Sequence, residues 1–187
     1  AFRPDKALGI ELRSWKPWLC DMEKRAGTAI TGFESLCEIL KERIAFFASL
    51  GCRASDHAFS YVPYAPATAE ELEEIFASVR NGALPTVEQA DKFKTALLRF
   101  LAKEYAKLGW AMELHIGPIR NNNTLMFKKI GPDAGFDSID DKEIAGKLSR
   151  FLDSLAVKEK LPRTVLFTLN PKDNYVLGTM LGNFQNS

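Results

Sequence analysis

Carboxylate, imidazole and amide side chains close several short apolar runs in this chain. Asp56 and His57 close "CRASDH", His115 closes "WAMELH", and Asn170 closes "VLFTLN". These groups can transfer protons or ligate a metal, and histidine changes its charge near neutral pH. The chain has only 2 histidines and both stand at such ends, so proton transfer or metal binding is the first chemistry to consider.

Two arginines lie beside further runs of the same kind. Arg3 stands in "AFRPDK", which could be the tail of a strand, and Arg120 follows His115 in "HIGPIRNNNT". Taken singly, these groups have simpler explanations. His115 could be a core histidine and Asp56 a helix cap, while Asn121–Asn123 could form a turn. Their coincidence at the ends of predicted strands favours a shared site.

Three apolar runs have the composition of strands, and the stretches between them have the spacing of amphipathic helices. The predicted strands cover 52–56, 110–115 and 163–170. The predicted helices cover 14–27, 31–51, 68–82, 86–109, 140–160 and 170–184. Thr68 and Glu71 form a capping box, and the continuous apolar run at 163–170 indicates a strand buried on both faces.

The alternation of strands and helices predicts an α/β fold with parallel strands and right-handed crossovers. The connection from Asp56 to Trp110 is long enough to hold two helices. In such sheets, ligands bind at the carboxyl ends of the strands. The groups that close the strands are therefore expected to meet on one rim.

The bulk composition is that of an ordinary globular chain. Of 187 residues, 46% are hydrophobic and 26% are charged, and the net charge is +1. No charge excess indicates a nucleic-acid or membrane-surface partner, and no stretch approaches the roughly 20 apolar residues of a membrane span. Three cysteines without CxxC spacing indicate free thiols in a reducing cytoplasm. The abrupt start at Ala1, without an initiator methionine or signal peptide, suggests an internal segment.

Five stretches of the sequence resemble the uronate isomerase (glucuronate isomerase) family. They are "RPDKAL", "GCRASDHA", "WAMELHIGPIRNNNT", "GPDAGFDSI" and "NPKDNYVLGTMLGNFQ", in order over essentially the whole chain. That family belongs to the metal-dependent amidohydrolase superfamily, which has a distorted TIM (β/α)8 barrel. The resemblance implies that 1–187 is a single partial barrel segment, from the end of the fourth strand through the seventh strand and its following helix. Residues 12–50 would be an extra helical section, of the kind that an insertion produces.

The resemblance also implies a reaction and roles for the rim residues. The family interconverts D-glucuronate with D-fructuronate and D-galacturonate with D-tagaturonate, by moving a proton between C2 and C1. His115 and Asp56 are the implied catalytic residues. The implied substrate-binding residues are Arg3, Arg120 and His57, and the guanidinium of Arg3 suits a sugar carboxylate. Whether His115 ligates a metal or bonds the substrate, and whether Asp56 orients His115 or transfers a proton, stays open.

The chain departs from the family pattern at the metal. The family's divalent ion, with zinc the expected one, is held by a His-x-His pair from the first strand and an aspartate from the eighth. This chain contains no His-x-His and ends at Ser187. It is therefore expected to lack the main ligands, to hold no metal by itself and to be inactive alone. The expected whole is a longer, homo-oligomeric cytoplasmic enzyme that acts on a small uronate sugar.

Two other functions fit the same residues. Another amidohydrolase-superfamily enzyme could hydrolyse a carboxylated substrate at the same rim. Alternatively, the chain could be a non-catalytic α/β scaffold whose helices between Ser14 and Gly51 pack against a partner.

Overall fold

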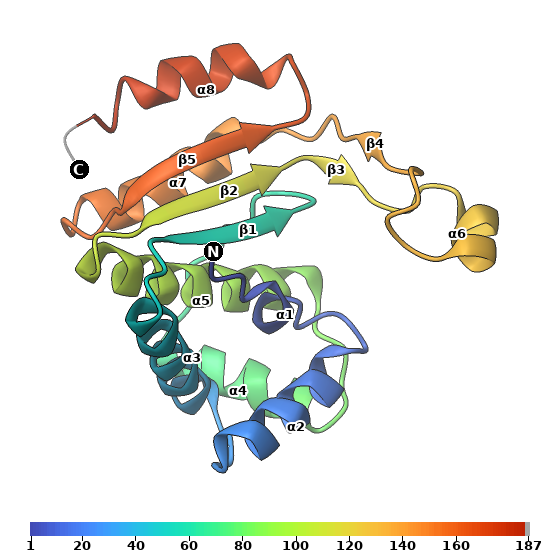
Figure 1. Ribbon diagram of the computed structural model, residues 1–187, viewed down its shortest axis with the longest axis vertical. Helices are drawn as coiled ribbons and strands as arrows, with labels where there is room; N and C mark the ends of the chain where they lie inside the picture. The colour runs from blue at the N-terminus through green and yellow to red at the C-terminus, as the bar shows by residue number, and fades with distance from the viewer. Residues whose placement is uncertain (186–187) are drawn as a thin grey trace.

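Three parallel strands form the sheet at the centre of the computed structural model, which describes residues 1–185 (Figure 1). They are β1 (Ala54–Phe59), β2 (Ala111–Ile116) and β5 (Arg163–Thr168), in the order β1-β2-β5. Phe2 continues the sheet beyond β1 through a parallel bridge to Ser55. The α/β prediction with parallel strands is confirmed, and the bridge agrees with a strand tail in "AFRPDK".

Helices cover one face of this sheet (Figure 1). α5 (Val87–Lys107) packs on β2 and on α7 (Ala145–Ala156), while α8 (Asp173–Leu181) packs on β5 and α7. β2 turns Met112, Leu114 and Ile116 toward the helices, and all three are buried. Side chains alternate along a strand, so this core leaves the other residues of β2 for the opposite face.

The connection between β1 and β2 holds two helices, as predicted. They are α4 (Ala69–Arg80) and α5, and a capping box begins each of them. At α4, the Thr68 hydroxyl accepts from the Glu71 amide at 3.2 Å, and the Glu71 carboxylate accepts from the Thr68 amide at 2.9 Å. The Thr68 and Glu71 amides would otherwise lack acceptors at the start of the helix, and the two side chains supply them. This local pairing explains why Thr68 and Glu71 predicted the helix start correctly.

The helices that precede β1 belong to the same hydrophobic core as the sheet. They are α1 (Asp5–Leu8), α2 (Trp15–Ala26) and α3 (Phe33–Ser49). The fully buried Trp15 ring lies 5.5 Å from the Phe76 ring and 5.9 Å from the Phe93 ring, between centroids, and so joins α2 to α4 and α5. Within residues 1–185, no helix combines the length and the hydropathy needed to cross a membrane.

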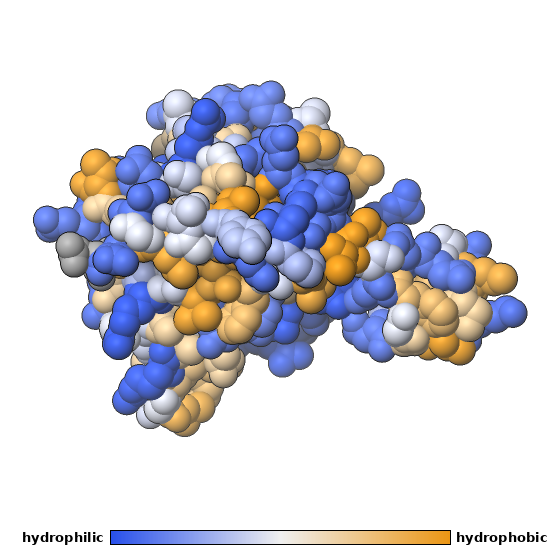
Figure 2. All heavy atoms as spheres, turned by 90° about the horizontal axis from the view of Figure 1, so that it is seen from above, coloured by the Kyte–Doolittle hydropathy of each residue, from blue (hydrophilic) through white to orange (hydrophobic). Residues whose placement is uncertain are grey.

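A projecting arm follows β2, and its elements were not predicted. It comprises β3 (Pro118–Ile119), α6 (Thr124–Ile130) and β4 (Ser138–Ile139), with β3 and β4 antiparallel. Figure 2 shows this arm standing off the body, with apolar side chains on its surface. α6 buries none of its residues, and elements this short carry little periodic signal, so the sequence could not indicate them.

Two strand predictions need correction. β1 does not end at Asp56 but continues to Phe59, whose carbonyl accepts from the Gly117 amide at 3.1 Å. β5 is not buried on both faces, because Val165 and Phe167 are 41% and 43% exposed. Within residues 1–185, no helix covers the face on which these two side chains lie. A continuous apolar run therefore predicted the strand correctly but not the covering of its second face.

Gly117 links β2 to the arm with a φ of 103°, a conformation that side chains disfavour. A Cβ at Gly117 would meet no atom within 4 Å, so substitution changes the backbone energy alone. We expect Gly117→Ala to destabilise the protein by about 1–3 kcal/mol, measured by denaturant unfolding.

The matched control for that substitution is Gly146→Ala, in the exposed first turn of α7, where the space is equally open. Because alanine favours helices, Gly146→Ala should stabilise the protein by up to about 1 kcal/mol. Equal effects at the two glycines would contradict the assignment of strain to Gly117.

Candidate active site

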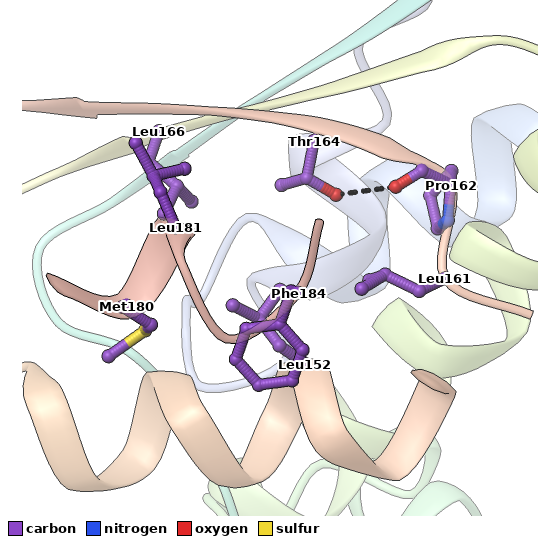
Figure 3. A pocket seen from close by; sticks show the side chains of 8 residues that line it. All are labelled: Leu152, Leu161, Pro162, Thr164, Leu166, Met180, Leu181 and Phe184. Carbon is purple, nitrogen blue, oxygen red and sulfur yellow. Dashed lines mark hydrogen bonds between the residues drawn. The ribbon is translucent and has the colours of Figure 1, made fainter. Parts of the chain in front are cut away.

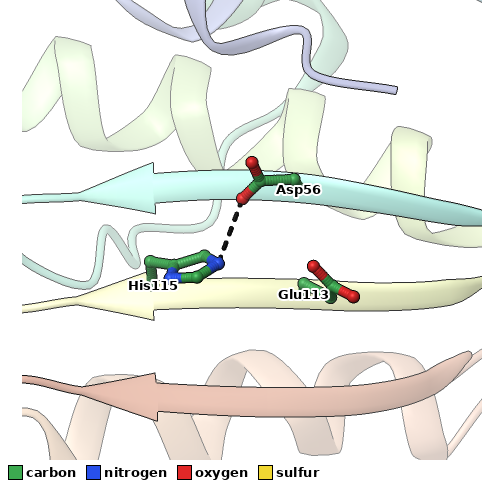
Figure 4. Close-up of side chains that lie close together, drawn as sticks. All are labelled: Asp56, Glu113 and His115. Atoms are coloured by element: carbon green, nitrogen blue, oxygen red, sulfur yellow. Dashed lines mark ion pairs between the residues drawn. The ribbon is translucent and has the colours of Figure 1, made fainter. Parts of the chain in front are cut away.

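The parallel register places Asp56, Glu113 and His115 on the sheet face opposite the helices (Figure 4). Asp56 of β1 pairs with Glu113 of β2, and His115 lies two residues further along β2. One ligand atom from each of the three side chains lies within 4.8 Å of the others. The same alternation that buries Met112 and Leu114 therefore gathers two carboxylates and an imidazole.

Asp56 contacts two cationic or ionisable partners. Its Oδ2 is 3.0 Å from Arg3 Nη1, and its Oδ1 is 3.2 Å from His115 Nε2. Its side chain is 20% exposed, whereas those of Arg3 and His115 are 52% and 45% exposed. Three residues predicted from sequence are thus joined, with Asp56 between the other two.

The His115 ring is held from the neighbouring strand. Phe167 pairs with His115 in register, and the two rings stack at 4.4 Å between centroids and 9° between planes. With Nε2 directed at Asp56, the stacking leaves Nδ1 as the imidazole atom for another partner. The half-exposed ring can therefore reach a ligand without losing its orientation.

Arg3 is fixed by two carboxylates on different segments. Its Nε donates to Asp5 Oδ2 at 2.9 Å, and its Nη1 lies beside Asp56. The hydrogen bond to Asp5 is the main reason that the pKa of Arg3 is raised, although partial burial opposes it. Among residues 1–185, Nη2 has no hydrogen-bond partner, so this end of the guanidinium is available to an anion.

The structure does not bring His57 to this face. His57 is fully buried among the helices on the other side of β1, 3.5 Å from Asp5 Oδ1 and 3.3 Å from the Tyr105 hydroxyl. Direct substrate contact by His57 stays a prediction that its placement does not support.

Arg120 lies in the arm rather than beside Arg3. Its Nη1 is 2.5 Å from Asp137 Oδ2, and the Asn121 amide donates to Asp137 Oδ1 at 2.8 Å. These two donors, the backbone amide first, lower the pKa of Asp137. Asn121 has a φ of 53° and the Asn123 side chain caps α6, so the asparagine run includes the turn that its composition allowed. Within the described chain, no hydrogen bond or ion pair joins Arg120 to the Asp56 cluster.

Asn170 lies two residues beyond the end of β5 and binds the loop before α7. Its side-chain amide donates to the Asp140 carbonyl at 3.0 Å and to Asp141 Oδ1 at 3.3 Å. Lys172 binds the same Asp141 carboxylate. This rim amide therefore holds the segment before α7 against the end of β5.

Glu113 is the site residue that sequence reasoning missed. It stands two residues before His115, so period-two alternation places both side chains on one face of a strand. Attention to strand ends alone passed over it, because Glu113 lies inside the strand.

The three clustered side chains fit a divalent cation. Asp56 Oδ1 is buried and, among residues 1–185, makes no hydrogen bond of good geometry, so this oxygen is open to a cation. Two carboxylates and one imidazole are donors that zinc and similar ions accept.

A separate pocket lies on the opposite side of the sheet, between β5, α7 and α8 (Figure 3). Its lining is almost wholly apolar, with Leu152, Leu166 and Met180 among its side chains. The Thr164 hydroxyl there is already used by the Pro162 carbonyl at 2.8 Å. This pocket offers packing space and no proton-transfer group, so the chemistry belongs to the Asp56 face.

Fold and cluster together define an α/β protein with a charged, histidine-containing site on one face of a parallel sheet. The family model for glucuronate isomerase matches residues 1–187, and the chain belongs to that family.

Individual relatives agree with the family. The chain is 50% identical over 185 residues to a uronate isomerase of Clostridium acetobutylicum, with 99% of this chain and 40% of that protein covered. It is 46% identical to a uronate isomerase of Serratia proteamaculans, with 99% and 39% covered. The chain thus spans about 40% of the length of the relatives it matches.

Two solved structures share the architecture. The uronate isomerase of Thermotoga maritima superposes with a TM-score of 0.91 at 26% identity, covering 98% of this chain and 40% of that one. The glucuronate isomerase of Caulobacter crescentus gives a TM-score of 0.81 at 27% identity, covering 92% and 36%. The helical section at 12–50 is therefore included in a fold shared with the Thermotoga protein.

The ionised Asp5 carboxylate should stabilise the fold, and this stabilisation should be lost in acid. Burial opposes ionisation of the Asp5 carboxyl, but the contacts with His57 and Arg3 outweigh it, so its pKa lies below the usual value of 3.8. A depressed folded-state pKa stabilises the protein above the unfolded pKa, and this stabilisation is lost as pH falls through the folded value. The melting-temperature difference between wild type and Asp5→Asn should therefore shrink below about pH 4. A difference that stays constant with pH would contradict this.

Proposed function

We propose that this chain contributes the substrate-binding and proton-transfer part of a uronate isomerase. The reactions are the interconversion of D-glucuronate with D-fructuronate and of D-galacturonate with D-tagaturonate. The observation that carries the proposal is the linked set of Arg3, Asp56 and His115 on one sheet face. Family membership supplies the reaction class, because the relatives bear the name uronate isomerase.

The proposed barrel explains why these residues lie on an open sheet face. β1, β2 and β5 would be the fifth, sixth and seventh strands of a (β/α)8 barrel, and the Phe2 bridge would mark the end of the fourth. The face with Val165 and Phe167 would then line the barrel interior, which side chains fill in such folds. A cytoplasmic, homo-oligomeric enzyme is the form that we propose for the complete protein.

Substrate binding falls to Arg3. A uronate carries a carboxylate at the end of the sugar that does not react, and a guanidinium binds such a group through paired N–H donors. Asp5 and Asp56 hold Nε and Nη1, which leaves Nη2 to meet the substrate. The sugar would be oriented with its other end, C1 and C2, toward His115.

Proton transfer falls to His115 and Asp56. An aldose becomes a ketose when a base removes the C2 proton and the C1 oxygen gains a proton, which gives an enediol. The C2 hydroxyl then loses its proton while the protonated base returns a proton to C1. His115 is the proposed base, and Asp56, 3.2 Å from Nε2, would stabilise the imidazolium that forms. The proton stays within the site, because the same imidazole can return it to C1.

A divalent ion, with zinc the proposed one, would supply Lewis-acid polarisation of the sugar carbonyl. Asp56, Glu113 and His115 are the residues of this chain that would hold or face it. Further ligands would come from strands outside this chain.

The isomerase proposal is tested with the complete purified protein and each uronate in turn. We expect the ketose to form, and His115→Asn to lower kcat/KM on the order of 10²- to 10⁴-fold, because the base is removed. Arg25→Gln is the control, since the Arg25 side chain is 74% exposed and, within residues 1–185, forms its ion pair with Asp21 alone. Failure of the wild type to form either ketose would overturn the proposal.

The metal assignment is tested by elemental analysis of the dialysed complete protein. We expect Glu113→Gln to weaken retention of the ion at least about tenfold, because a carboxylate beside the ion is neutralised. Glu88→Gln is the matched control, since Glu88 is 75% exposed on α5. Equal metal content in both variants would place the ion elsewhere.

A further inference from the structure

His57 is a fully buried imidazole whose Nε2 lies 3.3 Å from the Tyr105 hydroxyl and whose Nδ1 lies 3.5 Å from Asp5 Oδ1. From this geometry we infer that His57 is a positioning residue, which acts through Asp5 to hold Arg3 in the orientation that receives the substrate carboxylate. The inference rests on the proposed role of Arg3 and extends it to a residue on the opposite face of the sheet.

Two adjacent residues of β1, on opposite faces of the strand, act on Arg3. Asp56 points to the open face and meets Arg3 Nη1 directly at 3.0 Å. His57, the next residue, points into the helices and faces Asp5, whose other carboxylate oxygen accepts from Arg3 Nε at 2.9 Å. The two adjacent residues thus fix two edges of one guanidinium, and the third edge is the one left for a ligand.

One of the two carboxylate oxygens of Asp5 faces His57, and the other has two donors. Asp5 Oδ2 is bound by Arg3 Nε at 2.9 Å and by the Ala58 amide at 3.3 Å. Asp5 Oδ1 and His57 Nδ1 are both buried, and within residues 1–185 neither has a hydrogen bond of good geometry to any other group. The two atoms lie 3.5 Å apart, and such contacts often shorten when a ligand binds.

The surroundings of His57 favour one tautomer. With the hydrogen on Nδ1, the ring donates toward Asp5, and Nε2 accepts from the Tyr105 hydroxyl at 3.3 Å. Tyr105 is itself fully buried, and the Phe59 ring lies parallel to the imidazole at 6.0 Å between centroids. An apolar side chain could fill this space without the cost of burying polar atoms. The physical reason for an imidazole here is therefore its N–H donor toward Asp5.

The test uses three substitutions at His57 in the complete protein. Phenylalanine fills the space without a donor, asparagine keeps an N–H near the Nδ1 position, and glutamine keeps one near Nε2. We expect His57→Phe and His57→Gln to lower kcat/KM for the uronate on the order of 10- to 100-fold, mainly through KM. His57→Asn should recover most of the loss.

Tyr105→Phe is the matched control on the other side of the ring. It removes the partner of Nε2 while leaving Asp5 untouched, so it should lower the melting temperature with little change in KM. A merely structural role for His57 would instead give asparagine and glutamine variants that track stability, with KM unchanged, and that result would overturn the inference.

Crystal structures of the wild type and His57→Phe give a readout that does not depend on turnover. The inference expects the bond between Asp5 and Arg3 Nε to be lost or rotated in the variant, whereas an unchanged Arg3 would overturn it. If His57→Phe fails to fold, the His57→Gln structure serves the same comparison. A wild type without isomerase activity would refute the proposed function, while these structures would still decide the role of His57.

Discussion

Two carboxylates stand directly opposite each other on neighbouring strands, and this is the constraint on which the site depends. Asp56 and Glu113 are register partners on the same face of the sheet, where like charges repel. Arg3 and His115 both approach Asp56, within 3.0 and 3.2 Å. The Arg3 guanidinium offsets part of this repulsion at Asp56, and the charged face suits the anionic sugar and the divalent ion that we propose.

The rest of the fold keeps that face in place. Met112, Leu114 and Ile116 bury the other face of β2 against the helices, so a one-residue slip would turn the acidic face into the core. Phe167 stacks on His115 from β5, and Gly117 follows β2 with a positive φ at the point where the chain passes into the arm. Packing on one face therefore sets the chemistry on the other.

Much of this could be predicted from sequence, for identifiable physical reasons. Helices with a broad apolar stripe and a capping box, such as those begun by Thr68 and Thr86, carry local signals that the tertiary structure reinforces. His115 and Asp56 were found because parallel strands end at a common edge. Glu113 was missed since it lies within a strand, and the burial of His57 could not be known without the side of β1 on which it lies.

The features that sequence did not indicate depend on tertiary context. The arm elements are too short for a periodic pattern. The pairing of Arg120 with Asp137 spans an irregular loop, where sequence spacing does not predict which side chains meet. The apolar face of β5 looked fully buried because its composition is that of a strand inside a larger protein. The chain spans about 40% of the length of its relatives, and that face is the one that would line the interior of the proposed barrel.

The most direct measurement is a crystal structure of the complete protein with a non-reducing uronate analogue that cannot isomerise. The account predicts the sugar carboxylate at hydrogen-bonding distance from Arg3 Nη2, with C1 and C2 facing His115 and the ion beside Asp56 and Glu113. An analogue bound with its carboxylate away from Arg3, or on a different face of the sheet, would contradict it.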